Sequence, residues 1–156
     1  MINKVKKEIK ELIKKLEINC SIKEFQDKVD WNIISKFQKL SEDFIKEFKE
    51  IVNWNRISYY QKLSEDFIKE FKDEVNWNNI SYYQKLSENF IKEFKEIVNW
   101  NNISWKQKLS EDFIYDFQDK LDIDCLIENN KITKNRLLEL KKINSIHSRF
   151  EILDIR

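Results

Sequence analysis

The sequence predicts an all-α fold, a short α-solenoid of stacked two-helix 23-residue repeats with degenerate capping units at its ends. Four copies of one 23-residue segment follow each other without a gap, beginning at Trp31, Trp54, Trp77 and Trp100. A fixed period in this range is typical of stacked repeat arrays. Gly and Pro are both absent, which suits a largely helical chain and removes the tight turns that need glycine. Each copy also contains two stretches with helical spacing of apolar residues.

The second half of each copy has the clearer helical pattern. In the copy that begins at Trp54, apolar residues with i, i+1, i+4, i+8 spacing form one helix face: Phe67, Ile68, Phe71 and Val75. Ser64 precedes them as the predicted N-cap, because its hydroxyl can accept a hydrogen bond from a free backbone N–H. Leu63 and Ile68 flank this cap as a hydrophobic staple. The pattern predicts a helix of about 11 residues, roughly 16 Å long.

The first half of the same copy follows the same rules. Asn53 is the predicted N-cap, and Val52 and Ile57 form the staple pair. We expect the helix to end near Lys62. Its buried face is predicted to consist of Trp54 and Ile57 together with either Tyr60 or Gln61. Helices this short are marginal alone in water, so neighbouring copies must cover the apolar faces.

The whole chain, 1–156, is predicted to be a single repeat domain. Residues 1–30 form an N-terminal capping helix and a half-repeat, and residues 31–122 form the four repeats. Residues 123–145 form a degenerate capping repeat, and residues 146–156 form a tail.

Both predicted capping segments keep the apolar spacing of the repeat, but most of their residues differ from those of the four copies. The N-terminal helix has one apolar stripe, formed by Ile2, Val5, Ile9, Leu12, Ile13 and Leu16. A partial copy follows it, with apolar residues in register at Ile22, Phe25 and Val29. After the fourth copy the matching positions are Leu126, Ile132, Thr133, Leu137 and Leu140, with Thr133 in the place of the Ser cap. The lysine-rich first helix also fits a helix that lies on a membrane surface, but its glutamates make a capping role the preferred interpretation.

Composition mainly shows which classes of function are not favoured. Lys+Arg number 29 and Asp+Glu number 28, giving a net charge of +1. Such a balance provides no general attraction to nucleic acid or to an anionic membrane. No apolar run is long enough to span a membrane, and the N-terminus does not resemble a secretory signal. Cys20 and Cys125 are expected to be reduced thiols, so a cytoplasmic location is predicted.

No residues combine into a site for chemistry, so an enzyme is not expected, and neither is a cofactor or a metal. His147, the only histidine, has no second ligand or nucleophile at a suitable spacing. A glutamate recurs in each copy, at Glu42, Glu65, Glu88 and Glu111. Because a general acid–base pair needs two carboxyl groups in unlike environments, these are interpreted as helix N-terminal charges instead. The recurring tryptophans are interpreted as a stacking core rather than a cage for a cationic ligand.

Positions at which the copies differ are the candidates for recognition, since a stacking core needs the same residues in each copy. Positions 3 and 6, counted from each Trp, vary most and carry residue types that dominate binding hot spots. They give the candidate partner-binding strip: Arg56, Tyr59, Asn79, Tyr82, Asn102 and Trp105. The alternative interpretation is that these residues are merely exposed and weakly constrained. In that interpretation position 7, which is Phe37, Tyr60, Tyr83 or Lys106, is partly core.

The phrase W-N-x-I-S-x-x-Q-K-L-S-E-x-F-I-x-x-F resembles tandem repeats found in proteins of giant DNA viruses and of some AT-rich bacteria. The resemblance covers residues 31–122 and brings no assigned activity with it. It implies a role in conflict between a virus or phage and its host, in the host-cell cytosol.

The leading functional hypothesis is therefore a non-catalytic scaffold that binds a protein partner. One alternative is a repeat protein that binds single-stranded nucleic acid, with Tyr and Trp stacking on bases and lysines on phosphates. The lysines in question recur at Lys39, Lys62, Lys85 and Lys108. Near-neutral net charge disfavours this alternative. A third possibility is an inhibitor of a host defence nuclease, comparable to an anti-CRISPR protein. No membrane partner is expected.

Overall fold

The computed structural model describes residues 3–128, 132–136 and 138–139. These residues form α-helices and turns and contain no strand. The helices recur in regularly spaced pairs that pack on their neighbours, so the prediction of an all-α repeat solenoid is confirmed. The chain divides into two compact units, Met1–Gln84 and Lys85–Arg156, which are described separately. A single domain over 1–156 stays a prediction.

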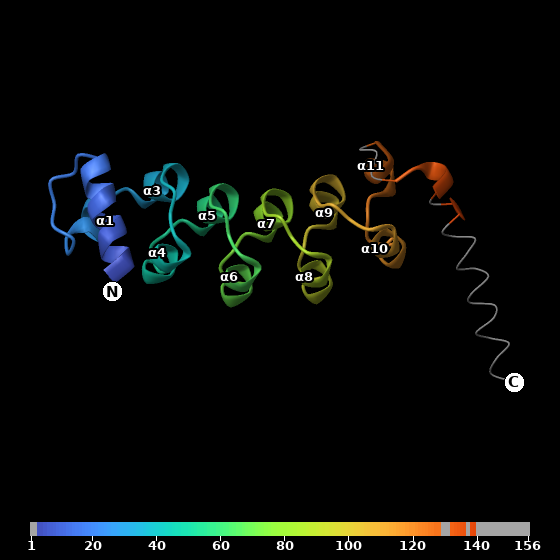
Figure 1. Cartoon of the computed structure of the whole chain (residues 1–156), viewed down its shortest axis with the longest axis horizontal. Coiled ribbons are helices and arrows are strands. Elements are labelled where there is room, and N and C mark those ends of the chain that lie inside the picture. Colours follow the sequence, from blue (N-terminus) through green and yellow to red (C-terminus); the bar gives the residue numbers. More distant parts are fainter. Residues whose placement is uncertain (1–2, 129–131, 137, 140–156) are drawn as a thin grey trace, which may run out of the picture. The chain divides into compact units, whose positions relative to one another are not determined.

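The first unit contains a capping region and the helices of the first copies. Its helices are α1 (Asn3–Lys15), α2 (Phe25–Lys28), α3 (Trp31–Phe37), α4 (Glu42–Glu47), α5 (Trp54–Tyr60), α6 (Glu65–Glu70) and α7 (Trp77–Tyr83). The first helices of successive copies form one row, in which α3 packs against α5 and α5 against α7 (Figure 1). The second helices, α4 and α6, form another row, and α1 packs against α4.

The second unit repeats this arrangement and then departs from it. Its helices are α8 (Glu88–Glu93), α9 (Trp100–Lys106), α10 (Glu111–Asp116) and α11 (Ile123–Glu128). Residues 134–136 and 138–139 are also helical. Helix α11 packs against α9, as the first helix of a following copy would (Figure 1).

The predicted caps start the helices. The Asn53 side chain accepts a hydrogen bond from the backbone N–H of Arg56, 3.0 Å away. The Ser64 hydroxyl accepts from the N–H of Phe67 at 3.2 Å. Both caps have extended backbone, which turns the chain into the helix without glycine. The staple residues Val52, Ile57, Leu63 and Ile68 are all buried.

The second helices are shorter than the prediction of about 11 residues. Helix α6 has 6 residues and ends at Glu70, because Phe71 adopts φ −110° and ψ 32°, outside the helical range. One further turn follows, closed by the N–H of Val75 donating to the Phe71 carbonyl at 3.1 Å. The bend brings the Phe71 ring centroid within 5.1 Å of that of Trp54. The apolar spacing predicted the right buried residues, but ring packing breaks the helix between them.

The first helices end where a glutamine turns inward. Helix α5 ends at Tyr60 rather than near Lys62, and Gln61 takes an extended conformation with φ −91° and ψ 148°. Of the two candidates for the buried face, Gln61 is buried and Tyr60 is exposed. The side-chain amide of Gln61 makes three hydrogen bonds across the repeat boundary, and these replace those it would make with water.

The N-terminal cap takes the place of a preceding repeat. Of the predicted apolar stripe, Val5, Ile9 and Leu12 are buried, Ile13 and Leu16 are half-buried, and Ile2 lies outside the described residues. Phe25 is also fully buried, whereas Ile22 and Val29 are half-buried. The Phe25 ring packs edge-on to Trp31 at 6.1 Å and to Phe44 at 6.3 Å between ring centroids. The apolar face of the first copy is thereby covered.

The C-terminal cap is described in part. Leu126 and Ile132 are buried, as expected from their repeat positions. The Thr133 hydroxyl accepts from the N–H of Arg136 at 3.1 Å, which confirms the predicted cap. Leu137 and Leu140 lie outside the described residues, as do His147 and the whole tail 146–156.

Candidate interaction surface

A ladder of buried glutamines fixes the row of first helices. The Gln61 Oε1 accepts from the N–H of Leu40 at 3.0 Å, and its Nε2 donates to the carbonyls of Ser35 and Gln38. Gln84 repeats the same three bonds one copy later, with Leu63, Ser58 and Gln61 as its partners. Because each bond joins one copy to the next, the ladder sets the spacing of α3, α5 and α7.

Serines and asparagines add a second ladder at the other end of these helices. The Ser35 hydroxyl accepts from the backbone N–H of Asn53 at 3.1 Å, and Ser58 accepts from Asn76 at 2.9 Å. The Asn53 amide also donates to the Asn32 side chain. The caps of α5 and α7 are thus bound to the first helix of the copy before, which leaves these helices little freedom to rotate.

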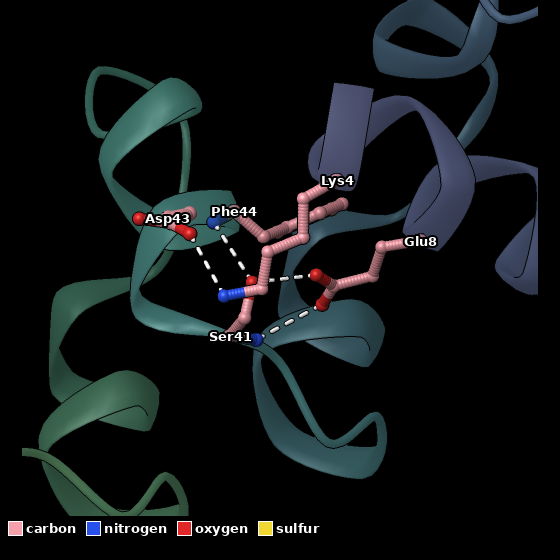
Figure 2. Close-up of polar contacts among 5 residues, drawn as sticks. All are labelled: Lys4, Glu8, Ser41, Asp43 and Phe44. Carbon is pink, nitrogen blue, oxygen red and sulfur yellow. Dashed lines mark hydrogen bonds and ion pairs between the residues drawn. The ribbon is translucent and has the colours of Figure 1, made fainter. Parts of the chain in front are cut away.

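The recurring glutamates contribute a third inter-repeat bond, which the sequence did not reveal. The Glu42 carboxylate accepts from the N–H of Ser64, the cap of the next second helix, at 2.6 Å. For the first copy the capping helix provides the same contact: Glu8 of α1 accepts from the Ser41 N–H at 2.9 Å and from its hydroxyl (Figure 2). Lys4 adds an ion pair with Asp43 at 2.9 Å, which raises the pKa of its amine.

On the outer side of the first helices of unit 1, the tyrosines of α5 and α7 are in ring contact, and Lys36 connects Phe37 of α3 to them. We call this surface the aromatic face, and it consists of Phe37, Tyr59, Tyr60, Tyr82 and Tyr83. The ring centroids of Tyr59 and Tyr83 are 3.9 Å apart, which joins α5 to α7. Tyr59 also contacts Tyr60 at 4.3 Å, and Tyr82 contacts Tyr83 at 4.6 Å. Phe37 is 63% exposed, and Tyr59, Tyr60 and Tyr83 are each about 40% exposed, at 39%, 43% and 43%.

Helix geometry explains why these rings face solvent. Ile57, Ser58 and Gln61 are turned into the structure by packing and by the ladders, so the two residues between them point outward. The outward side chains of neighbouring copies then lie side by side. Hydrogen bonding to Tyr59, followed by desolvation, raises the pKa of the Tyr83 hydroxyl to about 12.

Cations border the aromatic face. The Lys36 amine lies 4.5 Å from the ring centroid of Phe37 and 5.4 Å from that of Tyr60, both within cation–π range. Lys36 therefore connects the rings of α3 and α5. Within the described residues, no ion pair involves Lys36, Lys39, Arg56 or Lys62.

The predicted strip is divided between the two units. Arg56, Tyr59, Asn79 and Tyr82 belong to the first, and Asn102 and Trp105 to the second. Tyr59 and the half-buried Tyr82 belong to the aromatic face. Asn79 is half-buried, and its amide donates to the Asn55 carbonyl at 3.1 Å, so it helps to hold α7 on α5.

In the second unit, Trp105 is 44% exposed and the Lys106 amine lies 5.9 Å from its ring centroid. Asn102 is half-buried, and its backbone N–H donates to the Asn99 side chain at 3.0 Å. An exposed aromatic ring beside a lysine therefore recurs on α9.

Position 7 is exposed, whereas the alternative interpretation of the variable positions made it partly core. Phe37, Tyr60, Tyr83 and Lys106 are all exposed, and the neighbouring glutamine takes the inward place. As a result, three aromatic residues of the surface were missing from the predicted strip. The sequence did contain a signal: one copy has lysine at position 7, whereas every copy has glutamine at position 8.

The tryptophans that begin the copies are half-buried, and Trp54 shows two kinds of contact. The Trp54 ring packs against Phe71 and Phe67 of its own copy. Its indole N–H donates to the Lys49 carbonyl of the preceding copy at 3.0 Å. At this junction the tryptophan therefore joins two copies by a hydrogen bond, while its ring packs within its own copy.

Two hollows in the first unit contain charged groups. One, about 360 Å³, lies between α1 and the start of α4 and is lined by residues that include Lys7, Glu11 and Lys39. The other, about 270 Å³, lies beside Trp54 and is lined by residues that include Glu50, Asp73 and Glu74. Among the described residues no three His, Cys, Asp or Glu side chains gather as metal ligands.

Cys20 and Cys125 are both half-buried, and no disulfide joins these two described residues. No helix in the described part of the chain has the length and apolar character needed to cross a membrane.

Comparison of the chain with protein-family models, with curated proteins and with solved structures finds no match.

Proposed function

We propose that the protein is a non-catalytic scaffold that binds a protein partner through the aromatic face. The observation that carries this proposal is the contact among exposed tyrosines of successive helices, above all Tyr59 with Tyr83. Tyrosine is enriched at binding hot spots because a large rigid ring loses little conformational entropy on contact. A ladder of buried hydrogen bonds supports these rings from behind, so the surface is preorganised.

The proposal predicts that capture of the partner depends on the rings. Tagged wild-type protein and the Tyr59→Ser/Tyr83→Ser variant are used as bait in cells, and bound proteins are compared by quantitative mass spectrometry. We expect the variant to lose one or more specific partners, since hot-spot residues contribute about 2 kcal/mol or more each. Tyr115→Ser, a half-buried tyrosine of α10, is the matched control. Equal recovery by wild type and the double variant rules out the aromatic face as the binding surface.

A second candidate function is binding of single-stranded nucleic acid, and one observation favours it. The first ten residues of each copy contain no Asp or Glu, whereas lysine recurs there at position 9. Rings and unpaired cations on one surface are the features that such binding uses. Salt-dependent binding of a labelled oligouridylate would support this alternative.

The setting of this function is proposed from the sequence alone. The resemblance to repeats of giant DNA viruses and AT-rich bacteria suggests a factor in conflict between virus or phage and host, acting in the cytoplasm. Expression in phage-infected cells, with plaque counts as the measurement, tests the conflict role.

A further inference from the structure

In the first unit, the first and second helices of the copies differ in charge. The first helices, α3, α5 and α7, include basic residues and no acidic ones. The second helices begin with Glu and Asp. In the second row, lysines meet carboxylates directly: Lys46 pairs with Glu70, and Lys49 with Glu50 at 3.6 Å. The net charge of +1 therefore conceals a basic surface and an acidic one.

The unpaired cations lie around the aromatic face. Lys36 lies over two of its rings. Arg56 precedes Tyr59 and Tyr60 by three and four residues on α5, which puts it on the same side of the helix. Lys62 follows the last ring of α5 by two residues and is exposed. Each ring of α5 is thus close to a cation that meets no carboxylate within the described residues.

This arrangement suits a partner that carries both apolar and acidic side chains. Rings offer contact area to an apolar side chain, and the cations beside them offer an ion pair to a carboxylate. A carboxylate of the partner could pair with these cations without first breaking an existing ion pair. A lysine-rich partner would instead meet like charge, which is costly at an interface.

The spacing of the rings favours a peptide over nucleic acid. A base is about 3.4 Å thick, so its insertion between two rings requires roughly twice that separation. The centroids of Tyr59 and Tyr83 are only 3.9 Å apart, and those of Tyr82 and Tyr83 only 4.6 Å. The rings of these pairs are tilted by 39° and 57°, so no gap of base thickness lies between them, and their outer sides are left for contact.

We propose that the aromatic face and its border of Lys36, Arg56 and Lys62 form a docking site for an acidic segment of a protein partner. The segment carries carboxylates interspersed with apolar side chains. This inference rests on the proposed function and specifies the chemistry of the partner.

Three labelled probes of equal length test it by fluorescence anisotropy. They are a peptide of Asp, Glu and Phe, its counterpart with every acid replaced by Lys, and a single-stranded oligouridylate. We expect the acidic peptide to bind at least about tenfold more tightly than the lysine peptide, with an affinity that falls as salt is added. Tighter binding of the lysine peptide or of the oligouridylate overturns the proposal.

Charge reversal locates the site on the molecule. Lys36→Glu/Arg56→Glu is expected to weaken binding of the acidic peptide about tenfold or more. The control is Lys72→Glu, which reverses an exposed lysine after α6, away from the aromatic face. Equal weakening by the control would show a general charge effect and overturn the site. Circular dichroism confirms that each variant is folded.

Failure of this inference differs from failure of the proposed function. If partner capture depends on Tyr59 and Tyr83 but the acidic peptide does not bind, the acidic segment is wrong and the scaffold stands. If neither capture nor peptide binding depends on these rings, both are wrong.

Discussion

At the scale of single residues, position 8 of the repeat illustrates how a buried amide can set the spacing of a structure. Gln61 and Gln38 are the same residue type at the same repeat position, and both are buried. Gln61 accepts from the Leu40 N–H, but the Gln38 Oε1 has no hydrogen-bond partner among the described residues. The equivalent donor would be the N–H of Glu17, 23 residues before Leu40, and that N–H donates to Lys14 in the turn after α1.

This pair makes a matched test of the ladder. Gln61→Ala is expected to cost about 2–3 kcal/mol, because it leaves the buried Leu40 N–H and two carbonyls without a partner. Gln38→Ala removes the same side-chain volume, but the Gln38 Oε1 accepts no hydrogen bond. We therefore expect a clearly smaller loss of stability. Urea unfolding of both variants measures the difference. Equal losses would mean that volume rather than hydrogen bonding determines the cost.

A second residue-scale prediction concerns pH. The pKa of Tyr83 is raised to about 12, first by its hydrogen bond to Tyr59. Because the folded pKa exceeds the usual value of about 10, the unfolded chain loses this proton first as pH rises. The stabilisation is complete below pH 10 and is lost progressively between about 10 and 12.

Tyr59→Phe is expected to lower the pKa of Tyr83 toward its usual value and to weaken this loss of stability. Tyrosinate absorbance followed against pH, with Tyr115→Phe as the control, provides the measurement. A titration curve unchanged by Tyr59→Phe would contradict the hydrogen bond as the cause.

At the scale of helices, the turn after α1 carries a residue that does not suit it. Glu17 has φ 52°, in the left-handed region, and follows the end of the helix. The Ile18 N–H donates to the Ile13 carbonyl at 3.1 Å, and the Glu17 N–H to Lys14 at 3.3 Å. These two bonds define a Schellman motif, whose left-handed position is usually glycine.

Glu17→Gly is therefore expected to stabilise the protein by about 1 kcal/mol, since a left-handed conformation costs a residue with a Cβ roughly 1–2 kcal/mol. Chemical denaturation measures the gain. Lys10→Gly, an exposed position inside α1, is the control and should destabilise by about 1 kcal/mol, because glycine there only adds freedom to the unfolded chain. A loss of stability in both variants would contradict the strain at Glu17.

The helices also indicate how far sequence reasoning reached. Caps at Asn53 and Ser64 and the buried apolar residues followed from short-range rules, and the structure agrees. The end of α6 could not be predicted from these rules, because the bend at Phe71 depends on ring contacts with Trp54. Glu8 was missed for a related reason: α1 is outside the repeat register, so no spacing links it to Ser41. The aromatic face was found only in part, because either Tyr60 or Gln61 fitted the apolar spacing.

At the scale of the whole molecule, hydrogen bonds between copies repeat at fixed separations along the chain. The bond from a cap N–H to the serine of the copy before spans 18 residues in each of three cases, at Asn53, Asn76 and Asp122. Glutamine to leucine spans 21 residues at Leu40, Leu63 and Leu86. Within each unit, copies thus contact their neighbours in the same way, which is the condition for a modular, nearest-neighbour stability.

Modularity predicts that one whole copy can be removed. Deleting residues 54–76 joins Asn53 to Trp77 and recreates the junction that Asn76 makes with Trp77. We expect a folded chain with cooperative urea unfolding, whose m-value falls in rough proportion to the 23 of 156 residues removed. Deleting residues 54–63 alone removes α5 but leaves α6, so the ladders lose their register, and we expect aggregation or loss of cooperativity. If both deletions behave alike, copies do not act as units.

The longer deletion also removes Tyr59 and Tyr60 but retains Phe37, Tyr82 and Tyr83. We expect this chain to fold and to bind the partner more weakly. That result would separate the residues that build the stack from those that recognise a target.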